Sequence, residues 1–367
     1  MCQKQLENLA AVVEKFGSAP TIADMPRRTL ADKGINGPTA AHVIEEVHSP
    51  YNLAYLTFTT GSSAFQNIVG VTFEELPDRK RATQKALEMA NISRGAHALV
   101  TYAPLVNVYS AQALHEYGMT WSFLLRSSRD ALIVALCRDK PKVLIGESGF
   151  LKVALEDVAN LGLAEAMPRD CIVLCSGTPL DLDIIPLAQK YGWQIHDLYG
   201  CQEFGWIALD GRPLRDDISL VPSPLGDDYK ELVLGGLPLA DSFIIGAGGH
   251  ECNSSGQILT YRRKRTHPEY EVLITATTFS DPTIIEKAAR SILRIKSRVV
   301  KVHPHIKCNA EATEMQLVTN MALTERDAKP AATITGPQKT RLFDSLVEAQ
   351  IAFQKAGKTD PTWVKKS

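Results

Sequence analysis

Short hydroxyl side chains follow an apolar, β-prone run at residues 53–58: Thr59, Thr60, Ser62 and Ser63. Gly61 stands among them, and glycine lets a backbone turn tightly and come close to a ligand. Consecutive backbone N–H groups in such a turn can form an anion-binding nest. We therefore interpret residues 59–63 as a phosphate-binding loop that follows a buried strand. The alternative is a polar turn between two core elements, where these residue types are common.

A second candidate for chemistry is Glu203, which follows a Tyr-Gly pair at the end of an expected strand near residue 198. The end of a strand in an α/β sheet is where such folds present their ligand site. A carboxylate beside phosphate oxygens is a suitable ligand for Mg²⁺, a hard cation that prefers oxygen. The alternative for Glu203 is a solvated loop acid.

Three segments in this order resemble the adenylate-forming superfamily, which includes acyl-CoA synthetases, peptide-synthetase adenylation domains and luciferases. Residues 59–63 match the start of its Thr-Ser-Gly-Ser-Thr-Gly-x-Pro-Lys phosphate loop. Residues 174–180, Leu-Cys-Ser-Gly-Thr-Pro-Leu, resemble its adenine-side loop. Residues 197–205, Asp-Leu-Tyr-Gly-Cys-Gln-Glu-Phe-Gly, resemble its Tyr-Gly-x-Thr-Glu motif in the form found in phenylacetate–CoA ligases. The resemblance covers residues 50–240 well and the rest poorly.

The resemblance implies an enzyme that uses ATP and Mg²⁺ to join a carboxylate to the α-phosphate of ATP, with release of pyrophosphate. Because a carboxylate is ionised at neutral pH, the reaction needs positioning and charge neutralisation rather than a general base. The resemblance assigns phosphate binding to residues 59–63, Mg²⁺ to Glu203 and the α-phosphate contact to Gln202. It assigns the adenine site to Ser176, Gly177, Thr178, Pro179, Tyr199 and Gly200.

The sequence also departs from the family pattern. Asn67 replaces the lysine of the phosphate loop, and Gln202 replaces a threonine. No aspartate follows residues 261–265, where the family has its ribose-binding aspartate. Gly357-Lys358 is a weak candidate for the catalytic Gly-Lys pair of the C-terminal lid, and it resembles a frayed tail.

The nearest branch of the family is that of the phenylacetate–CoA ligases, and the size also resembles a lid-deficient member from phenazine antibiotic biosynthesis. We therefore expect a small aromatic carboxylic acid to be activated as an acyl-adenylate and passed to a separate reductase or acyl-acceptor protein. Candidates for the acyl pocket are Tyr102, Val106, Asn107, Tyr109 and Trp206. Two alternatives stay open: a complete aryl-CoA ligase with a compact lid built from residues 306–367, and a non-catalytic nucleotide-binding scaffold.

The elements that must position these residues alternate along the first part of the chain. Apolar runs predict strands at 53–58, 96–102, 121–125, 143–145, 171–175 and 193–198. Helical spacing predicts helices at 3–16, 38–47, 78–91, 110–117, 129–138, 151–161 and 182–191. This alternation is typical of an α/β, doubly wound architecture with mainly parallel sheets.

The pattern changes near residue 206. Short β-like runs appear at 207–209, 230–234, 242–245, 257–261 and 271–278, with Gly-Gly turns at 235–236 and 248–249 and a helix at 282–292. We expect a β-barrel-like subdomain at about 206–280 beside α/β subdomains at about 50–205. Together they would form an adenylating core at 1–300, followed by a short segment at 301–367 that is not a full lid.

Composition limits the function further. Forty basic and forty-one acidic residues leave a formal net charge of −1, which argues against nucleic acid or an anionic membrane as the main partner. With no apolar run long enough for a membrane span and no apolar signal core, we expect a cytoplasmic protein. The seven scattered cysteines do not form a disulfide framework. His303, His305 and Cys308 lack a fourth metal ligand, and we interpret the histidines as surface residues around a proline turn.

Overall fold

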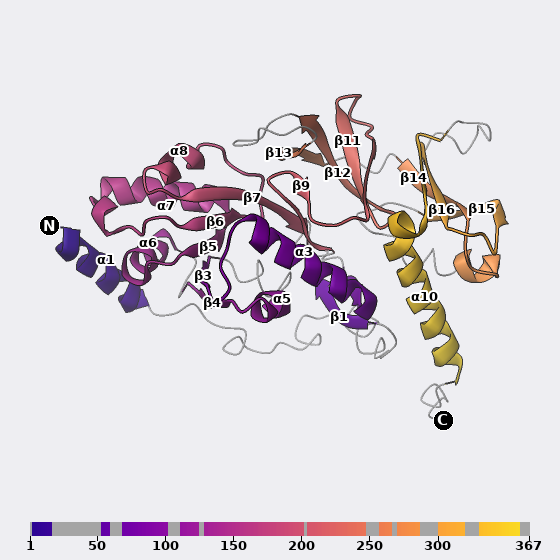
Figure 1. Cartoon of the computed structure of the whole chain (residues 1–367), viewed down its shortest axis with the longest axis horizontal. Coiled ribbons are helices and arrows are strands. Elements are labelled where there is room, and N and C mark those ends of the chain that lie inside the picture. The colour runs from indigo at the N-terminus through magenta and orange to yellow at the C-terminus, as the bar shows by residue number, and fades with distance from the viewer. Residues whose placement is uncertain are drawn as a thin grey trace, which may run out of the picture. The chain divides into compact units, whose positions relative to one another are not determined.

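The computed structural model describes these parts of the chain: residues 2–16, 53–58, 68–101, 111–124, 128–201, 204–246, 257–265, 270–286, 300–319 and 330–359. The chain, which Figure 1 shows as a ribbon, divides into two compact units. The first unit comprises Met1–Asn52, Ala90–Asn107 and Leu114–His196. The second comprises Leu53–Met89, Val108–Ala113 and Asp197–Ser367.

The first unit contains a parallel sheet. Its strands are β3 (His97–Val100), β4 (Thr120–Phe123), β5 (Val143–Gly146) and β6 (Ile172–Cys175), in the order β4-β3-β5-β6. All three pairings are parallel. Every residue of β5 is buried, as expected for the centre of a parallel sheet that is covered on both faces. The predicted α/β class with a parallel sheet is confirmed.

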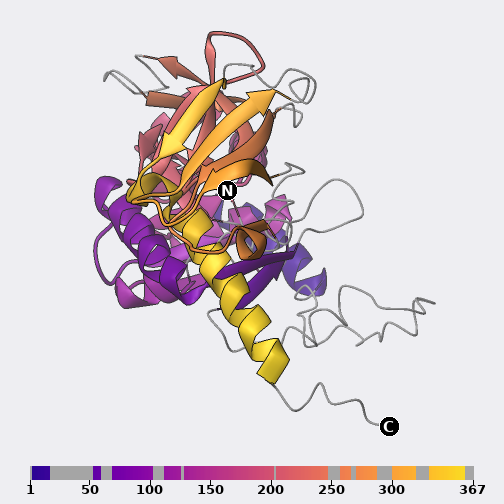
Figure 2. The same ribbon diagram turned by 90° about the vertical axis from the view of Figure 1, so that its right-hand side faces the viewer.

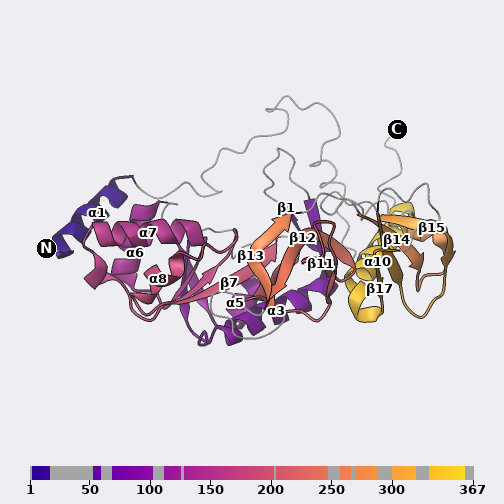
Figure 3. The same cartoon turned by 90° about the horizontal axis from the view of Figure 1, so that it is seen from above.

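The described residues of the first unit also form helices: α1 (Cys2–Phe16), α6 (Arg129–Asp139), α7 (Ser148–Asn160), the short η3 (Ala164–Ala166) and α8 (Ile184–Gln189). Helix α5 (Ala111–Glu116) crosses the boundary between the units. Contacts join α1 to α6, α6 to α7 and α7 to α8, as Figure 3 shows. The Oγ of Ser128 caps α6 by accepting a hydrogen bond from the N–H of Ala131 at 3.2 Å.

Strand β7 (Gln194–Cys201) begins in the first unit and ends in the second. In the second unit it pairs antiparallel with β8 (Gly205–Leu209), which pairs antiparallel with β9 (Arg212–Pro213). The strand is longer than predicted, so Tyr199 and Gly200 lie inside it and not at its end. The cause is β8, which returns along β7 and continues its hydrogen bonding beyond residue 198.

The second unit starts with an antiparallel pair, β1 (Leu53–Phe58) and β2 (Ile68–Thr72), followed by η2 (Phe73–Glu75) and α3 (Leu76–Met89). Pro77 lies in the first turn of α3, where its missing N–H has no helical acceptor to lose. The helix packs on β8. The predicted helix at 78–91 is therefore confirmed, while the one at 38–47 falls outside the described residues.

Two four-stranded sheets complete the second unit. The first has the order β10 (Ile218–Pro222), β11 (Tyr229–Leu234), β12 (Leu237–Gly246), β13 (Gln257–Arg265), and all its pairings are antiparallel. The second has the order β15 (Val300–Lys307), β14 (Tyr270–Ala276), β16 (Glu314–Thr319), β17 (Ala332–Thr335). Its β14–β15 pairing is parallel. Of the predicted helix at 282–292, residues 282–286 are described and helical.

The C-terminal part of the chain belongs to this unit. Helix α10 (Pro337–Thr359) contacts β17, β11 and β12, and Figure 2 shows it beside the second sheet. Leu342, Phe343 and Val347 of α10 lie in one core cluster with Met315 and Leu317 of β16. The sequence analysis predicted neither α10 nor β16 and β17. Gly357 and Lys358 belong to the last turn of α10, so the interpretation as a frayed tail was wrong for the backbone.

Several cysteines are buried. Burial raises the pKa of the Cys137 thiol to about 11 and that of Cys171 to about 12. Cys175 is also buried, and none of the cysteines in the described residues forms a disulfide. These thiols act as small core side chains. None of the helices in the described parts of the chain combines the length and the apolar character that crossing a membrane requires.

Candidate active site

Several predicted site residues fall outside the described parts of the chain. They are Thr59, Thr60, Gly61, Ser62, Ser63, Tyr102, Val106, Asn107, Tyr109, Gln202 and Glu203. The structure does place the strands that flank them: β1 ends at Phe58 and β2 begins at Ile68, so residues 59–67 connect two paired strands. Residues 202 and 203 connect β7 to β8. The phosphate, magnesium and acyl-pocket roles of these residues stay predictions.

The predicted adenine-side loop follows β6 in the first unit. Ser176 is buried, and its N–H donates a hydrogen bond to the carbonyl oxygen of Gly146 at 2.9 Å. Gly177 has φ +96°, a conformation that residues with side chains rarely adopt. A Cβ at this position would lie 3.2 Å from Cγ and Oε1 of Glu147. Gly177 is exposed, and its backbone lies close to the carboxylate of Glu147 in the loop after β5.

Ser148, at the start of α7, holds the far end of the same loop. Its Oγ accepts a hydrogen bond from the N–H of Asp181 at 2.9 Å and donates one to the carbonyl oxygen of Pro179 at 3.4 Å. Lys152, one turn further along α7, lies 2.6 Å from Asp181. The hydrogen bond to Lys152 lowers the pKa of Asp181, and it raises the pKa of Lys152 in turn. Helix α7 thus fixes the loop whose tip is Gly177–Pro179.

Polar residues gather where parallel strands β3, β5 and β6 end. Thr101 follows β3, Glu147 follows β5, and Ser176 follows β6. The N–H of Thr101 donates to the carbonyl oxygen of Ile145 at 3.0 Å, and its Oγ1 lies 2.6 Å from where a Cβ of Gly146 would be. The carboxyl ends of parallel strands are where α/β sheets bind ligands. We define Thr101, Glu147, Ser148, Ser176 and Gly177 as the carboxyl-edge cluster.

The sequence analysis missed Thr101, Glu147 and Ser148. A signal was present, because Thr101 is the last residue but one of a predicted strand and Glu147 comes two residues after another. Polar residues directly after buried apolar strands are the positions that a parallel sheet brings to one edge. These residues meet at that edge because β5 lies between β3 and β6. The spacing of residues along the sequence does not reveal this strand order.

Tyr199 lies in the second unit and is buried. Its hydroxyl donates a hydrogen bond to Oδ2 of Asp241 at 2.8 Å, and its ring meets Phe243 edge-on at 5.1 Å between centroids. The guanidinium carbon of Arg263 lies 5.4 Å from the ring centroid. Burial raises the pKa of Tyr199 well above its ordinary value, and the negative charge of Asp241 is the second cause of this increase. These contacts account for the position of the ring, and its predicted role beside adenine stays a prediction.

Gly200 is required by the fold around it. A Cβ there would lie 2.6 Å from the carbonyl oxygen of Gly205, because β7 and β8 approach closely at an irregular pairing between Tyr199 and Gly200. Opposite Gly200, Trp206 is fully buried, with 1% of its surface exposed. The predicted nucleotide role of Gly200 and the acyl-pocket role of Trp206 stay predictions.

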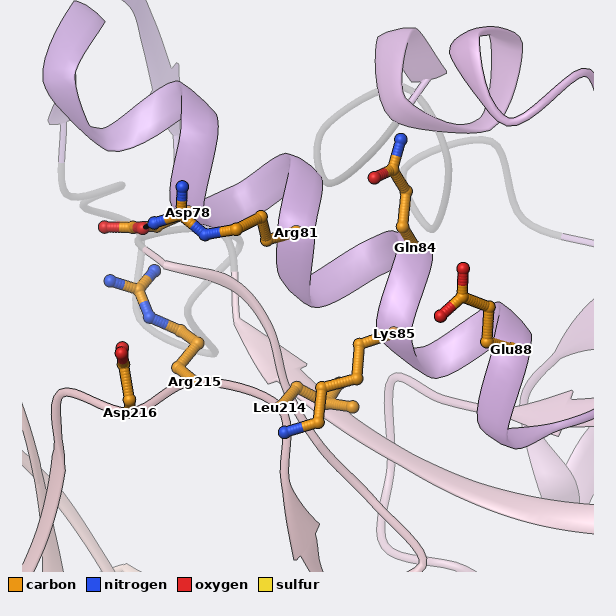
Figure 4. A pocket seen from close by; sticks show the side chains of 8 residues that line it. All are labelled: Asp78, Arg81, Gln84, Lys85, Glu88, Leu214, Arg215 and Asp216. Atoms are coloured by element: carbon orange, nitrogen blue, oxygen red, sulfur yellow. Dashed lines mark ion pairs between the residues drawn. The ribbon is translucent and has the colours of Figure 1, made fainter.

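A buried ion network lies elsewhere in the second unit. Arg215 donates to both oxygens of Asp217, at 2.9 and 2.7 Å, and also pairs with Glu75. Arg341 of α10 joins the network through Asp217 at 2.9 Å and through Asp78. A cavity of about 400 Å³ opens beside this network (Figure 4). It is lined by Asp78, Arg81, Gln84, Lys85, Glu88, Leu214, Arg215 and Asp216.

A second cavity, of about 850 Å³, lies in the first unit at the opposite edge of the parallel sheet from the carboxyl-edge cluster. It is lined by the residues that begin the strands, including His97, Val143 and Ile172. The two ring nitrogens of His97 lie 2.8 and 2.9 Å from the hydroxyls of Thr120 and Ser122.

No group of three or more His, Cys, Asp or Glu side chains within the described residues is arranged to hold an ion. His303 and His305 lie in strand β15 and not around a proline turn, with their ring centroids 5.9 Å apart. The predicted magnesium ligand, Glu203, is outside the described residues.

Comparisons with known proteins identify relatives of the chain. Residues 210–354 match the MadH C-terminal domain family. Over 362 residues, the chain is 56% identical to the ACP-SH:acetate ligase of Malonomonas rubra, and the alignment covers 99% of each chain.

Solved structures show weaker similarity. O-succinylbenzoate coenzyme A synthetase (MenE) from Bacillus subtilis, in complex with AMP, is 16% identical with a TM-score of 0.43. That alignment covers 57% of this chain and 62% of the synthetase, so the chain spans less than two thirds of that relative. A 2-hydroxyisobutyryl-CoA ligase in the postadenylation state is 11% identical, with a TM-score of 0.43, and the alignment covers 95% of this chain and 87% of the ligase.

Proposed function

The chain belongs to the family of the ACP-SH:acetate ligase of Malonomonas rubra, and from this premise we propose that it joins acetate to the thiol of an acyl carrier protein. The observation that carries the proposal is the 56% identity, which extends over 99% of both chains. Nearly the whole of the relative therefore has a counterpart in this chain. The chain is thus an enzyme of a ligase family. The identities of its acid substrate, its thiol acceptor and its nucleotide are what we propose.

The proposed energy source is ATP with Mg²⁺. ATP would supply an α-phosphorus for attack by the acetate oxygen, with pyrophosphate leaving, and the carrier thiol sulfur would then bond to the acyl carbon as AMP leaves. The carboxyl-edge cluster fits a nucleotide because it places the hydroxyls of Thr101 and Ser176 beside the exposed backbone of Gly177. Donors of this kind bind a polyanion without burying an unpaired cation.

Each residue has a proposed task. The backbone at Gly177 would lie against the purine, and Ser148 with Lys152 would hold the loop in place through residues 179–181. Residues 59–63 would bind the phosphates, Gln202 would contact the α-phosphate, and Glu203 would hold Mg²⁺. Tyr199 and Gly200 would contribute from β7. These last assignments rest on the motif resemblance described above.

The proposed acid and acceptor differ from those expected from the sequence. The motifs favoured an aromatic acid and a phenazine-type role, whereas a full-length relative carries acetate in its name. We give the relative more weight, because short motifs are shared by enzymes that act on many different acids. The acceptor protein expected from the sequence becomes the carrier thiol, and a reductase is not part of the proposal.

The test is ATP–pyrophosphate exchange with the purified chain and a panel of acetate, propionate, benzoate and phenylacetate. We expect exchange with acetate, and much less with the aromatic acids. Thioester formation is then measured with an acyl carrier protein that bears a free thiol and, separately, with coenzyme A. Faster transfer to the carrier than to coenzyme A supports the proposal.

Three outcomes would contradict it. Exchange with benzoate alone would restore the aromatic acid of the sequence analysis. Equal transfer to coenzyme A would favour a complete acyl-CoA ligase. If no acid supports exchange and calorimetry detects no ATP binding, the chain is a scaffold. Addition of EDTA should abolish exchange if Mg²⁺ takes part.

A further inference from the structure

Strand β13 changes character along its length. Its first half, Gln257–Thr260, is buried in the first four-stranded sheet of the second unit. Its second half contains four consecutive cations, Arg262, Arg263, Lys264 and Arg265, and three of them are exposed. Because successive side chains of a strand point to opposite faces, the cations occupy both faces of this segment. We call residues 261–265 the basic half-strand, which lies beside β12 in Figure 3.

Among the described residues, only one carboxylate forms ion pairs with the basic half-strand. Asp241 of β12 lies 4.0 Å from Arg263 and 3.8 Å from Arg265, and it also accepts the hydrogen bond of Tyr199. Lys264 lies over the ring of Tyr229, with its Nζ 4.8 Å from the centroid. Among the described residues, no carboxylate lies within ion-pair distance of Arg262 or Lys264. The basic half-strand therefore keeps a net positive charge.

Other cations of the same unit are neutralised. Lys301 pairs with Glu271 at 2.6 Å, and Arg341 pairs with Asp217 at 2.9 Å. The whole chain has a net charge of −1, so the four consecutive cations do not reflect a basic composition. Neither cavity described above includes a residue of β13. An exposed strand outside these cavities is better suited to a macromolecule than to a small anion.

We propose that the basic half-strand docks a carboxylate-rich face of the carrier protein that brings its thiol to this enzyme. The inference rests on the proposed function, which requires a protein substrate. Exposed Arg and Lys side chains attract an acidic protein surface over several ångströms, speed encounter and favour one orientation. Since the carrier must arrive and leave in every turnover, a solvated charged contact suits it better than a large apolar interface.

The experiment compares the wild type with the double variant Arg262→Glu/Lys264→Glu. We measure thioester formation against carrier concentration, and ATP–pyrophosphate exchange with acetate in the same preparations. The expected result is a fall of roughly tenfold or more in kcat/KM for the carrier, with exchange unchanged. For the wild type, kcat/KM should also fall as the salt concentration rises from about 0.05 M to about 0.5 M, because salt screens exposed charges. The double variant should lose most of this salt dependence.

The matched control is Lys307→Glu, which reverses an exposed lysine on another strand, β15, of the same unit. It should leave kcat/KM for the carrier unchanged. If the double Glu variant is insoluble, the neutral Arg262→Gln/Lys264→Gln variant replaces it, and a smaller decrease in the same direction is expected.

The proposal is overturned if the double variant has wild-type kcat/KM for the carrier, or if Lys307→Glu lowers it equally. It is also overturned if the wild type binds a DNA duplex more tightly than the carrier and the double variant loses only the DNA binding. These results leave the proposed function intact. The proposed function itself fails separately, if the wild type shows no acetate-dependent exchange.

Discussion

The loop after β6 depends on the absence of a side chain at Gly177. Its φ is +96°, and an added Cβ would meet Glu147 at 3.2 Å. We predict that Gly177→Ala lowers the free energy of unfolding by about 1–3 kcal/mol, the usual cost of strained backbone. If the loop contacts the nucleotide as proposed, KM for ATP should rise as well. Urea unfolding and the exchange assay measure the two effects.

A matched control lies nearby in α7. Gly149 has no positive φ, and an added Cβ would meet nothing within 4 Å. Because alanine favours a helix over glycine, Gly149→Ala should be neutral or stabilise the protein by up to about 1 kcal/mol. Equal losses of stability in the two variants would show that backbone strain at Gly177 is not the cause.

Tyr199 has a buried hydroxyl whose partner comes from a distant part of the chain. Tyr199→Phe removes the donor to Asp241 and leaves that carboxylate with less hydrogen bonding. The expected loss is about 1–3 kcal/mol of unfolding free energy, as for other buried groups that lose a partner. Tyr229→Phe serves as the control, because its partly exposed ring is the surface that Lys264 covers. Thermal unfolding that shifts equally in both variants would contradict this account.

The role of Tyr199 also shows how far single residues can be interpreted from sequence. The Tyr-Gly pair was expected just after a strand, and the structure places both residues inside β7. Its partner, Asp241, lies 42 positions away on β12. The contact arises because two strands from different sheets bury their side chains in one core, and nothing local to either residue encodes that pairing.

At the scale of elements, the turn between β11 and β12 depends on helix α10. Gly235 has φ +56°, and a Cβ there would lie 2.2 Å from Cβ of Leu342 and 3.0 Å from its backbone N. The N–H of Phe343 donates to the carbonyl oxygen of Gly235 at 2.9 Å. We predict that Gly235→Ala is strongly destabilising, by more than the roughly 1–3 kcal/mol of backbone strain alone, because α10 would have to move.

Gly226→Ala separates strain from collision. Gly226 also has a positive φ, +123°, but a Cβ there would meet nothing within 4 Å. Gly226→Ala should therefore lower the free energy of unfolding only by the cost of backbone strain. Urea unfolding of both variants measures the difference, and equal losses would mean that contact with α10 contributes nothing.

The α/β elements were predictable because the signal is local. Buried apolar runs such as β5 and β6 alternate with helices, and Pro77 and Ser128 mark helix starts. The C-terminal elements were missed for different reasons. Strand β15 alternates Val300, Val302 and Ile306 with polar residues, but Pro304 interrupts the apolar positions, and proline is confined to edge strands such as this one. Helix α10 did carry a signal, since Leu342, Phe343, Leu346 and Val347 share a helical face after Gly336 and Pro337.

At the scale of the whole molecule, the ion network makes stability depend on pH. Burial alone would raise the pKa of Asp217, but hydrogen bonds and charge from Arg215 and Arg341 lower it below its ordinary value. A carboxyl with a lowered folded-state pKa stabilises the protein above its unfolded pKa of about 4, and that stability is lost as the pH falls through the folded pKa. We therefore expect the free energy of unfolding to fall steeply in acid.

Asp217→Asn tests this expectation. At neutral pH it should cost about 3–5 kcal/mol, the usual effect of breaking a buried ion pair. The difference from the wild type should shrink as the pH is lowered from 7 to 3, because the wild-type carboxyl becomes protonated. Asp216→Asn, at an exposed neighbour, should have little effect at any pH. A constant difference across this pH range would contradict the assignment.

The same network has a consequence for biosynthesis. Glu75 and Arg341 are separated by 266 positions, yet they share Asp217 and Arg215 in one buried cluster. At about 5–20 residues per second, a ribosome needs roughly 15–50 s to pass from the first to the second. Arg215 is made about halfway through that interval, but the cluster lacks the guanidinium of Arg341 until its end, so the ion network of the second unit cannot be completed until synthesis is almost finished.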